Sequence, residues 1–245
     1  MSSARSNQII LENQAIRLRE EMQVRSTDSV SIHQILKYKH IVAFFRPMGD
    51  HLSGMAIKVQ KSGDAEPKRF MLINTSDVYC KQRFTCAHEL YHLLFQAEFQ
   101  SSYDVDVYGS KDPEEVNANN FATYLLLPET GLRQLIPMEE QRKDKITMAT
   151  LLMLEHNYRC SHQALLFRLR HLDIVTESFL DAHQNHIMQT ALEYGYNLSL
   201  YKPTNNTELV GDYNIKARAL YDAGKISQAK YYSYLRDMNI NGAAE

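Results

Sequence analysis

The stretch that decides the fold reads RFTCAHELYHLLF and spans residues 83–95. No Gly or Pro interrupts residues 79–98, so the sequence predicts a helix there. His88 and His92 are four residues apart, slightly more than one helical turn, and therefore stack on the same side of that helix. Two imidazoles placed in this way can share one metal ion, most commonly zinc. Glu89 projects beside the metal position, where it could take a proton from a water.

A helix that carries two histidines by accident is the alternative interpretation. Chance predicts roughly 0.03 His-Glu-x-x-His matches in a chain of this composition. An apolar stripe also runs along the same helix, and both histidines lie on its flank; the stripe consists of Ala87, Leu90, Tyr91 and Leu94. This arrangement is typical of a helix at the border of a cleft, and it favours the metal site over the accident.

A catalytic zinc site normally has three protein ligands, and the next predicted helix offers candidates for the third. Asp112 and Pro113 predict where that helix begins, and Pro128 predicts its end. Glu114 and Glu115 both lie near the centre of its apolar face, where a carboxylate is costly to bury unless it is paired or bound to metal. Glu115 could instead bond the backbone of Asp112 in a capping box. Helix geometry leaves these possibilities open.

The composition is that of a globular protein with one large or two small domains. Of the 245 residues 44% are hydrophobic and 23% charged, and the net charge is −2. So small a charge excludes a global basic field that would recruit nucleic acid or an acidic membrane. The three cysteines lack any CxxC spacing and favour a reducing compartment. No signal peptide or membrane span of ~20 apolar residues is recognisable, so we expect a cytoplasmic protein.

The remaining pattern predicts the fold class α+β. Helical periodicity is expected at residues 7–24 and again after Ser31, which can cap a second helix. Three short β-prone runs separated by turns predict a small antiparallel sheet, at residues 41–46, 55–60 and 69–74. From residue 146 onward the chain reads as almost wholly helical. We therefore expect a sheet-and-helix domain at residues 1–132 and a helical C-terminal region at residues 133–245.

Two segments together resemble the ImmA/IrrE family of zinc metallopeptidases: RFTCAHELYHLL at residues 83–94 and EVNANNFATYLLLP at residues 115–128. The family pattern is roughly R-F-T-x-A-H-E-x-x-H-x-L, followed by E-x-x-A-N-x-F-A-x-x-L-L-x-P. Weaker likeness extends over residues 30–175. The register against the second pattern implies that Glu115, rather than Glu114, is the third ligand. Asn119 matches the position of a polar residue that supports a ligand in related zinc peptidases.

The chain departs from the family pattern at two positions close to the predicted site. Tyr91 stands where a small residue is common, so it could narrow the cleft or reach into it. Cys86 replaces a usual aliphatic residue. Neither position is a predicted ligand.

The resemblance implies a zincin-like metallopeptidase domain at residues 1–132, with one zinc per chain held by His88, His92 and Glu115. Glu89 would act as the general base. Three tyrosines are candidates for contacts with the substrate or its oxyanion: Tyr91, Tyr103 and Tyr108. Strand 69–74 could offer an open edge to an extended peptide. The resemblance also implies one protein substrate, a helix-turn-helix transcriptional repressor, which an exosite after Leu132 would select.

A competing signal comes from two predicted helices, at residues 146–156 and 161–171, which are joined with helix-turn-helix-like spacing. The segment of interest is residues 157–172. This segment carries Arg159, Arg168 and Arg170 and no acidic residue, so a DNA-reading helix is conceivable. Three arginines are weak evidence for a DNA-binding surface, however, and the apolar residues of the second helix favour a helix packed against the rest of the protein. Direct DNA binding is therefore not expected. The second functional hypothesis is a non-catalytic regulator that binds DNA or a partner, with structural zinc or none.

Overall fold

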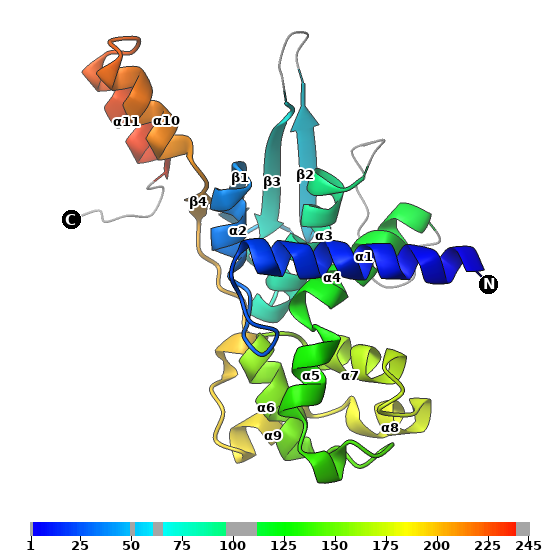
Figure 1. The fold of residues 1–245 in the computed structure, drawn as a ribbon. Coiled ribbons are helices and arrows are strands. Elements are labelled where there is room, and N and C mark those ends of the chain that lie inside the picture. The colour runs from blue at the N-terminus through cyan, green and yellow to red at the C-terminus, as the bar shows by residue number, and fades with distance from the viewer. Residues whose placement is uncertain (1, 50–51, 61–65, 97–111, 239–245) are drawn as a thin grey trace.

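The computed structural model describes residues 2–49, 52–60, 66–96 and 112–238. The fold class is α+β, as the sequence predicts (Figure 1). The N-terminal part contains α1 (Ser2–Glu21), α2 (Ile32–Tyr38), β1 (Ile41–Arg46), β2 (Gly54–Val59), β3 (Lys68–Asn74), α3 (Tyr79–Leu94) and α4 (Pro113–Leu126). The C-terminal part contains α5 (Glu129–Leu135), η1 (Met138–Glu140), α6 (Met148–Tyr158), α7 (His162–His171), α8 (Glu177–His183), α9 (Ile187–Glu193), η2 (Leu198–Tyr201), β4 (Glu208–Val210), α10 (Tyr213–Asp222) and α11 (Gln228–Met238).

The sheet is mixed, so the antiparallel sheet expected from the sequence is wrong in its topology. Its strand order is β2-β3-β1-β4, and β3 runs parallel to β1 but antiparallel to β2. Strand β4 pairs antiparallel with the other side of β1. The two central strands contain uninterrupted hydrophobic runs, IVAFF in β1 and FMLI in β3, which favour central positions.

Strand β3 therefore has no open edge, and the expectation that strand 69–74 could pair with a substrate peptide is wrong. β3 is bonded on one side to β1 and on the other to β2. Within the described residues, the edges of the sheet are β2 and β4. Any strand added next to the helix that carries the histidines would pair with β2.

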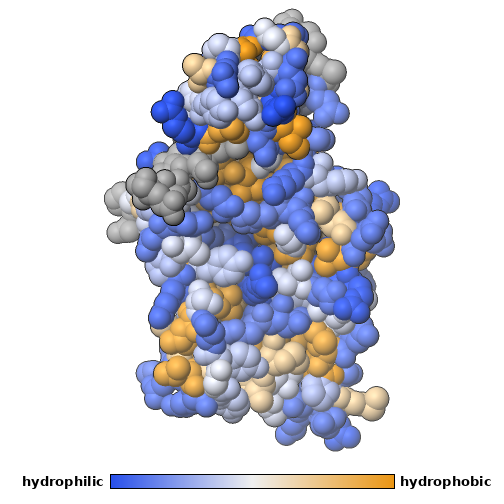
Figure 2. Space-filling view, turned by 90° about the vertical axis from the view of Figure 1, so that its left-hand side faces the viewer, coloured by the Kyte–Doolittle hydropathy of each residue, from blue (hydrophilic) through white to orange (hydrophobic). Residues whose placement is uncertain are grey.

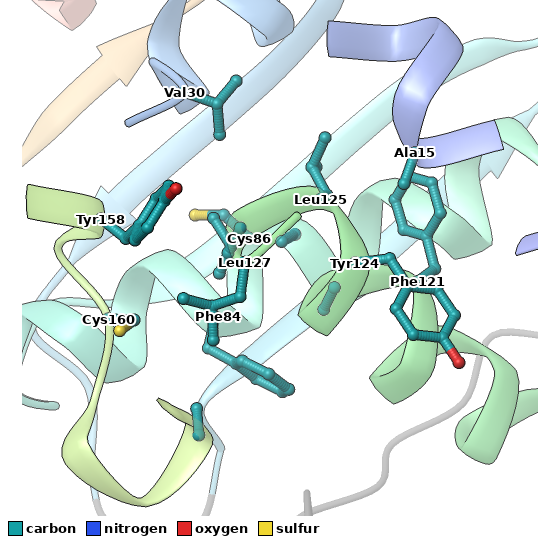
Figure 3. Packing of buried hydrophobic residues seen from close by; sticks show 14 of the residues in the cluster. Ala15, Val30, Phe84, Cys86, Phe121, Tyr124, Leu125, Leu127, Tyr158 and Cys160 are labelled. Atoms are coloured by element: carbon teal, nitrogen blue, oxygen red, sulfur yellow. The ribbon is translucent and has the colours of Figure 1, made fainter. Parts of the chain in front are cut away.

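Helix α4 packs against both α1 and α3, and all three helices contribute side chains to the main core (Figure 3). Ala15 of α1, Phe84 and Cys86 of α3, and Phe121 and Leu125 of α4 are all buried in it. Helix α1 begins at Ser2, five residues before the predicted start. Arg19, also on α1, is buried and donates hydrogen bonds to the carbonyl oxygens of Leu125, Arg25 and Asp28. The bond to Leu125 fixes α1 to the end of α4, and the other two hold the segment that follows α1.

The C-terminal part is connected to the rest of the molecule by hydrophobic packing, by a strand of the sheet and by side-chain hydrogen bonds. The main hydrophobic cluster includes side chains on both sides of the predicted boundary at residue 132, among them Leu126, Leu132, Leu151 and Leu165. Strand β4, far along the chain, joins the sheet through β1. A division into two domains at residue 132 stays a prediction.

The last two helices, α10 and α11, form a hairpin that projects from the body, at the upper left of Figure 1. They pack mainly on each other, with the rings of Tyr221 and Tyr231 stacked 5.0 Å apart. In Figure 2 the hairpin forms the top of the molecule, and hydrophobic side chains, in orange, are visible where it meets the body. Among the residues that the structure describes, no helix is long and apolar enough to cross a membrane.

Candidate active site

Helix α3 carries the two histidines, and a glycine allows the edge strand to approach it closely. A Cβ built on Gly54, at the start of β2, would lie 2.4 Å from Cγ2 of Thr85 on α3. Lys58 Nζ and Arg69 Nε donate hydrogen bonds to the carbonyl oxygens of Gln96 and Leu93, 3.1 and 3.2 Å away, at the end of α3. Cationic donors suit this end of a helix, where carbonyl groups lack helical partners. The sheet thus contacts α3 near Thr85 and at its C-terminal end.

Arg83, one turn before the histidines, ties α3 to the body from the other side. It is buried, and Nε donates to the carbonyl oxygen of Arg159 at 3.1 Å. Nη2 donates to Ser29 Oγ and to the carbonyl oxygen of Val30, each at 3.0 Å. Burial lowers the pKa of Arg83. Arg83 of the RFT segment therefore has a structural role: it holds α3 in place and does not contact the histidines.

Three side chains converge to form the candidate metal site: His88 and His92 of α3 and Glu115 of α4. The two Nε2 atoms are 3.1 Å apart, and the Glu115 carboxylate oxygens lie 3.0 Å from His88 Nε2 and 3.4 Å from His92 Nε2. A tetrahedral ion bonded at 2.0–2.1 Å holds its ligand atoms about 3.3 Å apart. The donor set and its spacing therefore fit a metal ion.

Amide side chains orient both imidazoles from behind. His88 Nδ1 lies 2.9 Å from Asn119 Oδ1, and His92 Nδ1 lies 2.8 Å from Gln96 Oε1. Because an amide oxygen only accepts, each Nδ1 carries the proton and each Nε2 directs its lone pair toward the shared centre. Such bonds fix the tautomer and the ring orientation of metal-binding histidines. Asn119 takes the supporting position that the resemblance implies.

Glu89 lies next to His88 on α3 and is buried beside the converging group, with 9% of its surface exposed. Among the described residues, that group contains His88, His92 and Glu115 and does not include Glu89. Burial raises the pKa of Glu89, while the charges of His88 and His92 and a backbone hydrogen bond from Ala56 of β2 oppose the rise. A carboxylate with a raised pKa suits proton transfer near neutral pH.

The carboxylate of Glu115 is held in its charged form by its two neighbours. When His88 and His92 are protonated at Nε2 as well as at Nδ1, they donate to this carboxylate, and these hydrogen bonds lower the pKa of Glu115 well below its ordinary value. Burial alone would lower the pKa of His92, but the bond with Glu115 and the charge of Glu89 raise it overall. The site thus concentrates negative charge on a single point between two imidazoles, as a cation site requires.

Glu114, the neighbour of Glu115, points elsewhere. Its Oε2 accepts a hydrogen bond of 2.8 Å from the hydroxyl of Tyr91. The Tyr91 ring packs 6.0 Å from the ring of Phe121, and burial together with the Glu114 bond raises the pKa of Tyr91 to about 12. Tyr91 is thereby anchored between α3 and α4, and a role in substrate binding stays a prediction for it. Tyr103 and Tyr108 lie outside the described residues.

Two features of the site are not predicted by the sequence pattern. Gln96 lies one turn after His92, just past the end of α3, and only its position four residues on could have suggested the contact. The other feature is β2, because the sequence pattern does not reveal which strand is next to α3. The backbone of Ala56 reaches Glu89 from this strand.

The arginines of the helix-turn-helix-like segment have different environments. Arg168 is buried: Nε donates to the carbonyl oxygen of Leu127 at 3.1 Å, and Nη2 donates to Glu12 Oε1 at 2.8 Å. Arg170 pairs with Glu177. Arg159 is exposed and takes a left-handed conformation at the end of α6, with φ of 54°. Of the three arginines, Arg168 therefore has a structural role in the packing of α7.

Comparison with known protein families identifies a family whose domain includes these residues. The model of the IrrE N-terminal-like domain, which defines a peptidase family, matches residues 36–170, more than half of the 245-residue chain. The match covers α3 and α4 and thus all three converging side chains. The comparison with curated proteins gave no match. The chain belongs to the peptidase family of the IrrE N-terminal-like domain.

Proposed function

We propose that this protein is a cytoplasmic, zinc-dependent endopeptidase that cleaves one specific protein, a transcriptional repressor of the helix-turn-helix class. The observation that carries the proposal is the convergence of His88, His92 and Glu115, with the buried carboxylate of Glu89 beside them. A purely structural zinc site has no need of that additional carboxylate. Three buried cysteines, none in a disulfide, support a reducing compartment.

The chain supplies the ligands, their supports and a base. When bound by His88, His92 and Glu115, zinc would supply a Lewis acid that lowers the pKa of a water and polarises the scissile carbonyl. Glu89 accepts the proton of the attacking water and later donates it to the leaving amine. Asn119 and Gln96 hold the imidazoles in the required tautomer.

The substrate segment binds in an extended conformation along β2. This strand lies at the edge of the described sheet and directly against α3. An extended peptide can add to such an edge through main-chain hydrogen bonds, with its side chains alternating between two directions. The backbone contact between Ala56 and Glu89 brings this edge next to the base. The sequence suggests β3 as the strand that pairs with the substrate peptide; we propose β2 for this role instead.

The decisive experiment compares the wild type with Glu89→Gln, using as substrate a helix-turn-helix protein identified by a search of the neighbouring genes. The wild type should cut this protein at one or a few peptide bonds. Glu89→Gln should keep its zinc and bind the same protein, with cleavage slowed by about 10²–10⁴-fold, the usual loss when a general base is removed. Glu114→Gln is the matched control, because Glu114 bonds Tyr91 outside the converging group.

Two outcomes would contradict the proposal. Cleavage by zinc-loaded Glu89→Gln at the wild-type rate would show that Glu89 is not the base. If the wild type cuts no tested protein, yet binds its partner equally well without zinc, the non-catalytic regulator becomes the better interpretation.

A further inference from the structure

The sheet has a second apolar face, on the side away from α2 and α3. Alternation along the strands and the register between them place Phe44 beside Leu72 and Leu209, and Phe70 beside Val42 and Ile57. We call this surface the outer face; its members are Val42, Phe44, Met55, Ile57, Val59, Phe70, Leu72 and Leu209. The inner-face residues, such as Ala43 and Ile73, are fully buried.

The helices that pack on the sheet both lie on its inner side. Gly54, an inner position, contacts Thr85 of α3, and the ring of Phe45 stacks on His33 of α2 at 5.2 Å. On the outer face, Phe44, Ile57 and Val59 are exposed by 40%, 37% and 41%. Met55, Phe70, Leu72 and Leu209 are partly buried and Val42 is buried, so in the described part of the chain the outer face is partly open to solvent.

The sequences of the central strands match a sheet covered on both faces. Residues 41–45 read IVAFF and residues 70–73 read FMLI, without the polar alternation of a sheet that has one wet face. A contiguous apolar surface of this kind on a soluble domain marks an interaction site. The pattern therefore indicates that a further layer covers the outer face.

The charges around the outer face select among possible partners. Outward positions of the described strands include Arg46 and Lys68, at opposite ends of the face, and no carboxylate. Two copies stacked face to face would oppose like charges at these ends, which disfavours a symmetric dimer. A segment with an apolar stripe and acidic flanks complements both the centre and the ends.

The outer face is also continuous with the proposed cleavage site. Strand β2 bonds Glu89 through Ala56 and carries Met55 and Ile57 on the outer face. A substrate strand added at the β2 edge would direct alternate side chains toward the site and toward the outer face. Chain that follows the scissile segment can therefore continue directly onto the outer face.

We propose that the outer face, and not the helical region after Leu132, is the exosite of the peptidase and binds an amphipathic helix of the substrate protein, with an apolar stripe flanked by Asp and Glu. This inference rests on the proposed peptidase function. The face extends about 20 Å along the strands, a length that matches a helix of about 13 residues. Docking of this helix would give selectivity for one protein to a site that hydrolyses an ordinary peptide bond.

The test uses a displayed library of random peptides about 16 residues long, selected on zinc-loaded Glu89→Gln full-length protein. Enriched peptides should carry apolar residues at helical spacing with acidic neighbours. Their affinity should fall about tenfold or more when Phe44→Glu and Ile57→Glu are added, and also with Val59→Glu alone, a milder change at the end of β2. Leu192→Glu, at an exposed apolar position on α9, is the matched control and should leave affinity unchanged.

Selected peptides that bind all variants equally would overturn the exosite. So would a concentration-dependent dimer of the wild type that the outer-face substitutions abolish, because a second copy would then cover the face. Cleavage separates this proposal from the proposed function. If the peptidase assignment holds and only the exosite is wrong, Phe44→Glu, which lies on β1 and not on the β2 edge, cleaves the substrate repressor as fast as the wild type. If the peptidase assignment itself is wrong, no form cleaves, whatever the library selects.

Discussion

Glu114 and Glu115 are neighbours on α4, yet their carboxylates meet different partners. Glu115 faces the two Nε2 atoms, and Glu114 accepts from Tyr91. We expect about one zinc per chain in the purified protein, because the three-ligand set is typical of one catalytic site. His88→Ala, His92→Ala and Glu115→Ala should each lose most of the metal in elemental analysis, and Glu114→Ala should keep it. Full zinc in Glu115→Ala with loss in Glu114→Ala would contradict this assignment.

The amides behind the histidines should tune metal affinity. Gln96→Ala and Asn119→Ala remove the acceptors of the two Nδ1 protons, and loss of such supports typically weakens metal binding 10–100-fold. Competition with a chromophoric chelator measures this loss directly. Asn120→Ala, a partly buried neighbour on α4, serves as control and should bind metal like the wild type. Equal affinity in all three variants would show that the rings are held by packing alone.

At the residue scale, the sequence predicts the site where it depends on spacing within one helix. His88, Glu89 and His92 follow from helical periodicity, because four residues make about one turn. The choice between Glu114 and Glu115 does not follow from periodicity, since both lie near the apolar face, and only the family register resolves it. Gln96 escapes prediction because its contact depends on a side-chain conformation just beyond the end of α3.

At the scale of elements, Arg168 should matter for stability. Arg168→Ala leaves the carbonyl of Leu127 and the carboxylate of Glu12 without their partner, and such a buried loss costs about 1–3 kcal/mol. Arg170→Ala, which breaks the pair with Glu177 and the contact with the Phe167 ring near the surface, should cost about 1 kcal/mol or less. Chemical denaturation measures both changes. Equal and small costs would mean that Arg168 is not part of the packing of α7.

The strands show which part of an element can be predicted from sequence. Their positions follow from short apolar runs between turns, and all three predicted runs are strands within one residue. Their pairing does not follow, because turns do not reveal that β3 inserts between β1 and β2. β4 is also missed, since three residues, Glu208–Val210, give no periodic signal. Long-range pairing, rather than local propensity, determines both.

At the scale of the whole molecule, β4 and the α10–α11 hairpin are consecutive but should contribute differently to stability. β4 buries Val210 against the sheet, and the segment before it bonds Thr75: Thr75 Oγ1 donates to the carbonyl oxygen of Asn206 at 2.7 Å. The hairpin buries little; in its described part, Ala217 is the one buried side chain. The two segments can therefore be separated by truncation.

We expect a chain that ends at residue 212 to keep its fold and its zinc, because the hairpin packs mainly on itself. A chain that ends at residue 203 loses Val210, the bond from Thr75 and the contact between Gln82 and Thr204. Burial of one valine and two hydrogen bonds is worth about 3 kcal/mol or more. For a domain of this size, the melting temperature should then fall by roughly 6 °C or more. Thermal unfolding followed by circular dichroism, with metal analysis on both truncations, measures the difference. Loss of zinc or of cooperative unfolding in the chain that ends at residue 212 would show that the hairpin belongs to the peptidase fold.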